Sequence, residues 1–144
     1  MKFINSKGKE VKKSIYQIRL KYPWRMVNLK TKSILFASND IYEPNSITRP
    51  KLKLYESFDW QQKGNNLFDE KLGKWKLKNK KIYIDEITVN LFGDLRIKFS
   101  NNNVFETFTD TETDIEIWRL FECRNKENKI IVTGERFISD NYFK

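Results

Sequence analysis

The sequence predicts a mainly β protein: an antiparallel meander forming a sandwich or partly open barrel, with at most one or two short helices. Short segments alternate apolar and polar residues with a period of two, which is typical of half-buried strands. Turn-forming Gly, Pro, Asn, Asp and Ser residues separate these segments at short intervals. No amphipathic helical pattern of about 10–15 residues lies between them, as a parallel sheet would require.

Three strands are expected in the first part of the chain. Residues 14–22 alternate strictly, with Tyr16, Ile18, Leu20 and Tyr22 on one face. Pro23 interrupts the pattern because it lacks an N–H, and residues 24–29 resume as a short apolar run that can pair after a bend. Residues 34–37 form the third expected strand, closed by the turn-prone Ser38-Asn39-Asp40.

The middle of the chain lacks periodicity. Residues 38–66 contain Pro44, Pro50 and Gly64 and are expected to form a connecting loop, with one strand at residues 51–55. A short helix is expected at residues 66–72, with Gly73 as its C-terminal stop. Because loops host binding residues more often than strands do, this loop is a candidate recognition element.

The remaining strands follow in quick succession. Residues 82–91 and 95–99 are expected to pair through the Gly93-Asp94 turn, and residues 104–109 return after Asn101-Asn102-Asn103. Residues 110–114 are a polar turn, 115–123 a further strand, and 124–128 another turn before the strand 129–133, which Gly134 ends. A short apolar tail contains Phe137, Ile138, Tyr142 and Phe143.

The length of 144 residues predicts a single domain spanning residues 1–144, with enough chain to build one hydrophobic core. Cys123 is the only cysteine, so no internal disulfide can form and a reducing, cytoplasmic location is expected. The first residues lack the apolar core of a signal peptide, and no run approaches the roughly 18 apolar residues of a membrane span. No membrane association is predicted.

The net charge of +9 is the one compositional extreme. Residues 1–32 carry ten Lys and Arg and one acid, residues 51–81 nine Lys and four acids, and residues 104–122 one Arg and six acids. Such an uneven basic field can attract nucleic acid, an anionic membrane surface or an acidic protein. The competing interpretation is compositional bias, in which lysine fills solvated positions.

A further pattern resembles small uncharacterised bacterial proteins of the immunity type. It consists of residues 93–99 (GDLRIKF), 102–108 (NNVFETF), 116–121 (EIWRLF) and 131–134 (IVTG), with Tyr22-Pro23-Trp24-Arg25 and Asp59-Trp60 earlier in the chain. The resemblance implies binding to another protein, as the immunity proteins of bacterial toxin systems bind their toxins. The chain departs from this class in being more basic than an inhibitor of a cationic nuclease toxin should be.

Catalytic chemistry finds little support. The chain has no histidine, which removes Ser-His-Asp and Cys-His triads and the usual zinc sites, and it has no glycine-rich phosphate loop. The remaining enzyme hypothesis is a metal-dependent nuclease built on Glu10-Val11-Lys12 or Glu127-Asn128-Lys129. An acidic cluster could bind a hard cation or line a solvated edge; it comprises Asp110, Glu112, Asp114 and Glu116. We predict no catalytic residue, metal, cofactor or small-molecule ligand.

Aromatic and basic residues supply the candidate binding site. Lysines interleave with Trp75 and Leu77 in a pattern able to contact phosphates and stack a base, and the candidate residues are Arg19, Arg25, Trp60, Lys74, Trp75, Lys76 and Lys78. The alternative is that Trp75 and Leu77 point inward, while the lysines line the outer face of a strand or extended segment. Alternation also assigns Trp118, with Glu116 and Leu120, to one strand face and Arg119 to the other, so Trp118 is expected in the core.

Two functions follow from these features. The first is a non-catalytic protein-binding domain, an immunity or antitoxin-like factor that uses the loop 38–66 and one edge of the sheet. The alternative is a nucleic-acid or polyanion binder that uses the basic segments, with affinity that falls steeply as salt rises.

Overall fold

The computed structural model describes residues 2–4, 10–12, 16–21, 23–53, 56–124, 129–135 and 137–140, with the backbone alone for residues 2–4, 10–12 and 137–140. Two compact units result, one of residues 1–21 with 109–144 and one of residues 22–108. The prediction of a single domain stays a prediction. Among the described residues, no helix has the length and apolar character needed to cross a membrane.

The first unit contains a four-stranded antiparallel sheet in the order β11-β10-β9-β3. Its strands are β3 (Tyr16–Leu20), β9 (Glu116–Glu122), β10 (Lys129–Thr133) and β11 (Phe137–Asp140). Two further strands, β1 (Lys2–Ile4) and β2 (Glu10–Lys12), form a hairpin of their own. Among the described side chains of this sheet, Ile117, Trp118 and Val132 are the buried apolar ones, and the expectation that Trp118 belongs to the core is confirmed.

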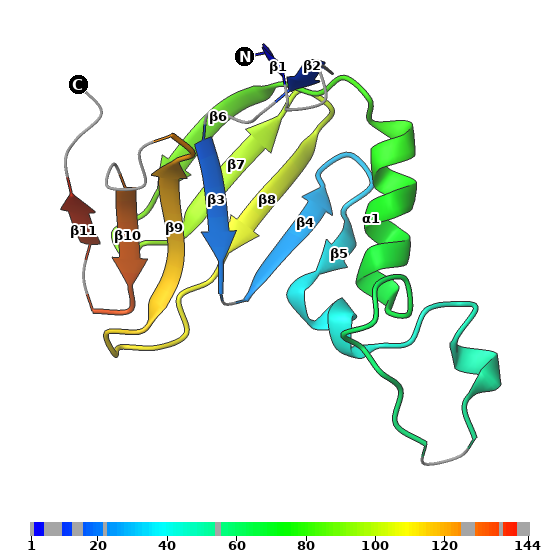
Figure 1. The fold of residues 1–144 in the computed structure, drawn as a ribbon. Helices are drawn as coiled ribbons and strands as arrows, with labels where there is room; N and C mark the ends of the chain where they lie inside the picture. The colour runs from blue at the N-terminus through cyan, green and yellow to red at the C-terminus, as the bar shows by residue number, and fades with distance from the viewer. Residues whose placement is uncertain are drawn as a thin grey trace. The chain divides into compact units, whose positions relative to one another are not determined.

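The second unit is a five-stranded antiparallel sheet with one α-helix, in the strand order β5-β4-β8-β7-β6. Its elements are β4 (Trp24–Asn28), β5 (Ser33–Ala37), the 3-10 helices η1 (Ser38–Tyr42) and η2 (Arg49–Lys51), α1 (Leu67–Lys78), β6 (Ile84–Val89), β7 (Leu95–Phe99) and β8 (Asn103–Thr107). Figure 1 shows α1 beside β5 at one end of the sheet, with β6 at the other end.

The fold class is confirmed: the chain is mainly β, its sheets are antiparallel, and none of them closes into a barrel among the described residues. The period-two segments became strands because alternation places one apolar set on a buried face. In β7, for example, Leu95 and Ile97 are buried while Arg96 and Lys98 lie on the other face. Asn102 takes a positive φ of 61° in the β7–β8 turn, as expected of an Asn in a hairpin.

The helix corrects the largest error of the sequence interpretation. We expected it to stop at Gly73, but it continues to Lys78. A glycine ends a helix by taking a left-handed conformation, and among the glycines with positive φ are Gly64 and Gly93 but not Gly73. Phe68, Leu72 and Trp75 share the inner face of α1, because residues three and four apart on a helix lie on one side. Packing of Phe68 and Trp75 against Phe36 stabilises the helix beyond the glycine.

Two smaller expectations also differ from the structure. The prediction of a strand at residues 51–55 is wrong for residues 51–53, because Lys51 ends η2 and neither Leu52 nor Lys53 is in a strand. Residues 54 and 55 lie outside the described part. The expected grouping of Glu116 with Trp118 is also wrong. A register shift in the β9–β10 pairing breaks the alternation there, and the Glu116 carboxylate bonds to the Arg119 guanidinium.

The aromatic residues of the second unit meet between α1 and the sheet. The Phe36 ring lies 5.9 Å from the rings of both Phe68 and Trp75, and 6.2 Å from that of Trp24, in edge-to-face arrangements. Trp24 also contacts Phe105 on β8 at a centroid distance of 5.7 Å. This cluster fixes α1 on the sheet, and α1 in turn carries the base of the loop described next.

Candidate functional site

Residues 74–78, the predicted basic and aromatic surface, belong to the helix α1 and not to an extended segment. Residues two apart on a helix point to nearly opposite sides, so Lys76 lies away from Lys74 and Lys78. Trp75 points inward to Phe36, whereas Leu77 is 73% exposed. The expectation that Trp75 and Leu77 share an inward face is therefore wrong, because it assumed an extended segment.

The other predicted residues are distributed over both units. Arg19 lies on β3 in the first unit, directly opposite Arg119 of β9. Arg25 lies on β4 in the second unit, where its Nε donates to Glu106 Oε2 at 2.9 Å and its guanidinium lies 4.8 Å from the centre of the Phe108 ring. Within neither unit do all the predicted residues come together.

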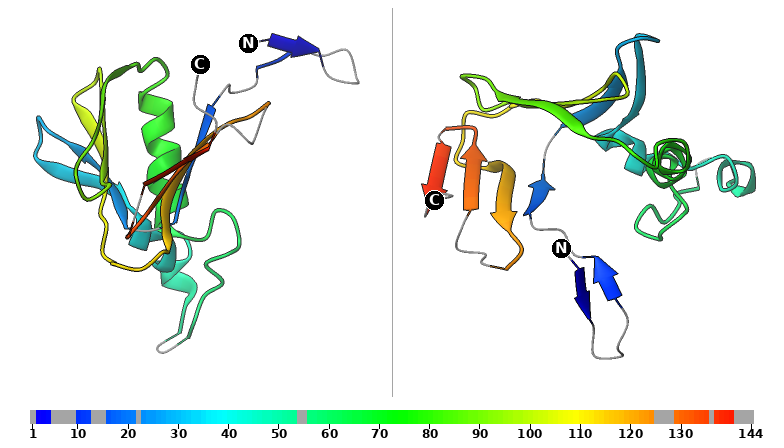
Figure 2. Two further views of the ribbon diagram at one scale, coloured as in Figure 1. Left: turned by 90° about the vertical axis from the view of Figure 1, so that its left-hand side faces the viewer. Right: turned by 90° about the horizontal axis from the view of Figure 1, so that it is seen from above.

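Trp60 does lie in an exposed aromatic site. Its ring contacts the ring of Tyr42 edge to face, with centroids 5.1 Å apart. Tyr42 is 58% exposed and Trp60 is 37% exposed. Ile47, on the same loop, is 68% exposed. We name residues 38–66 the recognition loop. In Figures 1 and 2 its outer part extends beyond the N-terminal end of α1.

A buried asparagine holds the recognition loop from within. Asn45 is 4% exposed, and its Oδ1 accepts hydrogen bonds from the backbone N–H groups of Ile47 at 3.1 Å and Thr48 at 2.8 Å. Its Nδ2 donates to the backbone oxygen of Gly64 on the other side of the loop. One side chain thus joins two loop segments that lie almost twenty residues apart.

The first turn of α1 holds the same loop from outside. Asn66 caps the helix by accepting from the Asp69 N–H at 2.8 Å, and its Nδ2 donates to the Trp60 carbonyl at 3.1 Å. Asp69 accepts from the Gly64 N–H at 2.7 Å, and Glu70 accepts from the Ser46 N–H at 2.8 Å. Carboxylates are favoured at this end of a helix by its dipole, so the groups that start α1 also anchor the loop.

We predict that Asn45→Ala loosens the recognition loop without unfolding the protein. The substitution leaves three backbone groups without their partner, and a lost buried partner costs about 1–3 kcal/mol. Amide hydrogen exchange at Ile47 and Thr48 should accelerate, while exchange in β7 and β8 should not change. An equal acceleration in the strands would contradict a role confined to the loop.

The Glu70 carboxylate gives a pH-dependent test of this anchor. Its hydrogen bond to Lys74, followed by the hydrogen bond from the Ser46 N–H, lowers the pKa of Glu70 from 4.5 to about 2. Because the folded pKa is lowered, the carboxylate stabilises the folded state above pH 4.5, and this contribution is lost as pH falls towards 2. We expect the NMR titration of the Glu70 carboxyl carbon to have its midpoint near that lower value. Lys74→Met should raise the midpoint and Lys78→Met should not; equal midpoints in all three proteins would contradict the assignment.

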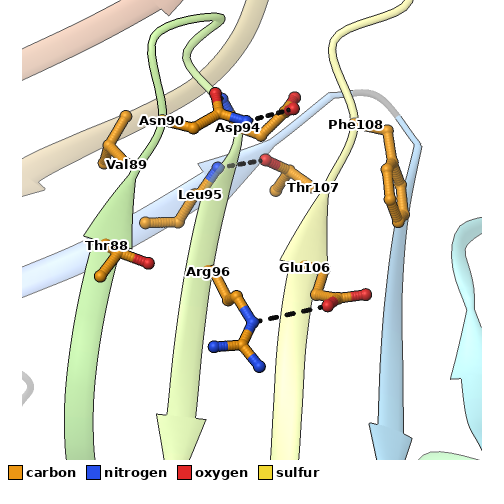
Figure 3. A pocket seen from close by; sticks show the side chains of 9 residues that line it. All are labelled: Thr88, Val89, Asn90, Asp94, Leu95, Arg96, Glu106, Thr107 and Phe108. Atoms are coloured by element: carbon orange, nitrogen blue, oxygen red, sulfur yellow. Dashed lines mark hydrogen bonds and ion pairs between the residues drawn. The ribbon is translucent and has the colours of Figure 1, made fainter.

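A pocket of about 250 Å³ lies on the sheet of the second unit, at one end of β6, β7 and β8 (Figure 3). The Phe108 ring, Arg96 and the Asn90–Asp94 turn are among its walls. The polar side chains of Asn90, Asp94 and Thr107 in its lining already have partners within the protein: Asn90 Nδ2 donates to Asp94 at 2.9 Å, and Thr107 Oγ1 accepts from the Leu95 N–H at 2.8 Å. Arg25 and Arg96 approach different oxygens of Glu106, at 2.9 and 3.6 Å. This is the arrangement of a cross-strand ion pair that holds a sheet face.

Groups suited to metal chemistry do not gather in the described part of the chain, where no set of three or more His, Cys, Asp or Glu side chains could hold an ion. That part includes the acidic residues from Asp110 to Glu116. Of the two Glu-x-Lys triplets, residues 127 and 128 lie outside the described residues, and residues 10–12 form β2, described by its backbone.

Comparisons with protein-family models, with curated proteins and with solved structures find no match to this chain.

Sequence reasoning identified the loop and Trp60 but missed Tyr42 and Ile47. Their only signal was the presence of large apolar residues inside an aperiodic segment. The loop that carries Tyr42 and Trp60 is joined by the contact of Asn45 with Gly64, which lies far away in the sequence, and by the contact of Asn66 with Trp60.

Proposed function

We propose that this protein is a non-catalytic protein-binding module and that the recognition loop is its docking surface. The observation that carries the proposal is the exposed Tyr42–Trp60 pair on a loop fixed by two buried asparagines. Tyr and Trp are enriched among the residues that dominate protein interfaces. A loop that is already ordered loses less conformational entropy on binding, which favours affinity.

The resemblance to immunity proteins makes a toxin the first partner to test. An immunity protein is normally encoded beside its toxin, so the product of the adjacent gene is the first candidate. In this function the module forms a stoichiometric complex and carries out no turnover.

The test is a binding measurement by isothermal titration calorimetry with that gene product. Trp60→Ala is expected to weaken binding at least about 30-fold, the equivalent of a hot spot of about 2 kcal/mol. Leu77→Ala is the matched control, since Leu77 is an exposed apolar residue of the same unit outside the loop. Equal affinities for Trp60→Ala and wild type would contradict the proposed surface, and absence of binding by wild type would contradict the proposed partner.

A second candidate function, polyanion binding, is favoured by one feature of the first unit. Arg19 lies opposite Arg119 in the β3–β9 register, and Lys21 approaches the same Glu116 that Arg119 contacts, at 4.0 Å. Like charges directly opposite one another are unfavourable, and a phosphate backbone would relieve them. Fluorescence anisotropy with DNA and RNA oligonucleotides at about 50 and 200 mM salt tests this function. Binding that is absent at the lower salt, or that Arg19→Ala leaves unchanged, would exclude this site.

A further inference from the structure

The strand β6 leaves one edge of the five-stranded sheet uncovered. It is the last strand in the order β5-β4-β8-β7-β6, and all six of its residues are exposed. At the opposite edge, β5 contacts α1 through Phe36. Edge strands present unpaired N–H and C=O groups and are commonly protected by charges, bulges or a covering helix. Among the described residues, β6 has a bulge and two charges but no covering element.

The apolar side chains of β6 gather on one face of the sheet. Ile84 lies opposite Phe99, Ile87 opposite Ile97 and Val89 opposite Leu95. A register shift between Ile84 and Glu86 keeps Ile84 on the face of the other two, although it is three residues from Ile87. Ile84 and Ile87 are each 55% exposed and Val89 is 42% exposed. Their neighbours on β7, Leu95 and Ile97, are buried. The strand therefore carries a half-exposed apolar row along its edge.

The backbone groups that point outward belong to Ile87 and Val89. The Asn90 N–H donates to the Asp94 carbonyl at 3.1 Å, so residue 90 faces β7. In an antiparallel pair successive residues alternate between facing the neighbour and facing away. Thr88 and Glu86 then face β7, and Ile87 and Val89 present their N–H and C=O groups to the open edge.

We propose that a second copy of this chain pairs with β6 in an antiparallel, twofold-symmetric arrangement. With Thr88 on the symmetry axis, Ile87 of one copy lies opposite Val89 of the other, and these are the residues whose backbone groups point outward. Two such pairs exchange four hydrogen bonds and join the two apolar rows on the same face. The axis places Thr88 against Thr88 on the other face, a favourable cross-strand pair, and no like charges lie directly opposite.

The charges around β6 favour a second copy as the occupant. Residues 80–94 contain two lysines and three acids, which makes this segment nearly neutral within a chain of net charge +9. The lysines, Lys80 and Lys81, precede β6, whereas Asp94 follows it. Antiparallel pairing brings the beginning of one β6 alongside the end of the other, so the segment that carries Lys80 and Lys81 approaches the turn that carries Asp94. A uniformly basic edge would not have this self-complementarity.

Analytical ultracentrifugation of the full chain tests the proposal through molecular mass. We expect the weight-average mass to rise with concentration from the 17.4 kDa of the chain towards twice that value, with a dissociation constant on the order of micromolar. Val89→Pro removes an outward N–H while leaving the hydrogen bonds to β7, since proline is tolerated on an open strand edge. This variant and Ile87→Lys should stay monomeric. Leu77→Lys adds the same charge at an exposed apolar position of α1 and should associate like wild type.

Amide hydrogen exchange of the wild-type protein provides a readout that needs no variant. The N–H groups of Ile87 and Val89 should exchange fast in dilute samples and slowly in concentrated ones, whereas that of Thr88 should not change with concentration. A monomeric mass at every concentration would overturn the proposal. So would a dimer whose Ile87 and Val89 amides stay unprotected, since the copies would then meet elsewhere.

Discussion

Phe36→Ala is expected to lower the free energy of unfolding by about 3–5 kcal/mol, the range measured for truncating a large buried aromatic residue. Phe36 is 4% exposed, and its ring contacts those of Trp24, Phe68 and Trp75. The substitution opens a cavity between α1 and the sheet and removes several edge-to-face ring contacts, each of which adds stability beyond the buried area. Because β4, β5 and α1 all contribute to this cluster, the cavity cannot collapse without moving an element.

Urea denaturation followed by circular dichroism measures this loss, with an unchanged dependence on urea concentration indicating that stability alone has changed. Leu91→Ala is the control, since Leu91 is fully exposed and its truncation is expected to change stability by less than about 0.5 kcal/mol. A loss from Phe36→Ala as small as that of the control would mean that the helix does not depend on the aromatic cluster.

The strands were predictable because their signal is local. In β7, the alternation of Leu95, Ile97 and Phe99 with Arg96 and Lys98 gave both the element and its buried face. The β7–β8 turn was also predictable from the sequence, since Asn102 supplies the positive φ that the turn needs. Both patterns depend only on a few neighbouring residues, so contacts with distant parts of the chain do not change them.

The helix α1 was underestimated because its decisive contacts are not local. Gly73 and the charge-rich stretch that follows gave a weak helical signal, and the alternation of lysine with Trp75 and Leu77 favoured an extended segment. Contacts of Phe68 and Trp75 with Phe36, more than thirty residues earlier, outweigh that local preference. In the helix, the predicted lysines point to different sides and Trp75 packs against Phe36.

The candidate site was predictable only in outline. An aperiodic segment with Trp60 suggested a recognition loop, but the fixed geometry of that loop comes from Asn45 and Asn66. Asparagine in a loop usually signals a turn, and nothing in the sequence distinguishes a turn-forming Asn from one buried across two segments. Likewise, the sequence predicted β6 as a strand but did not give the strand order that places it at an edge.

Gly134→Ala is expected to destabilise the four-stranded sheet by about 1–3 kcal/mol, the usual cost of overpacking, or more. A Cβ at position 134 would lie 2.1 Å from the backbone oxygen of Thr111 and 2.8 Å from that of Thr113. Both oxygens belong to a turn closed by the contact between the Thr111 and Thr113 hydroxyls at 2.8 Å. Since the obstacle is backbone and not the end of a flexible side chain, the strand or the turn must move. Native-state hydrogen exchange in β9 and β10 measures the loss.

Gly73→Ala is the informative counterpart, because the same added methyl group should have the opposite effect. A Cβ at position 73 meets nothing within 4 Å, and the residue lies in the middle of α1. Alanine reduces the conformational freedom of the unfolded chain and is favoured in a helix, so a gain of about 0.5–1 kcal/mol is expected. A gain at position 73 with a loss at position 134 would establish that the helix runs through Gly73 and that the 111–113 turn lies against β10. A loss at position 73 would instead favour the sequence-based interpretation, in which Gly73 ends the helix in a left-handed conformation that alanine resists.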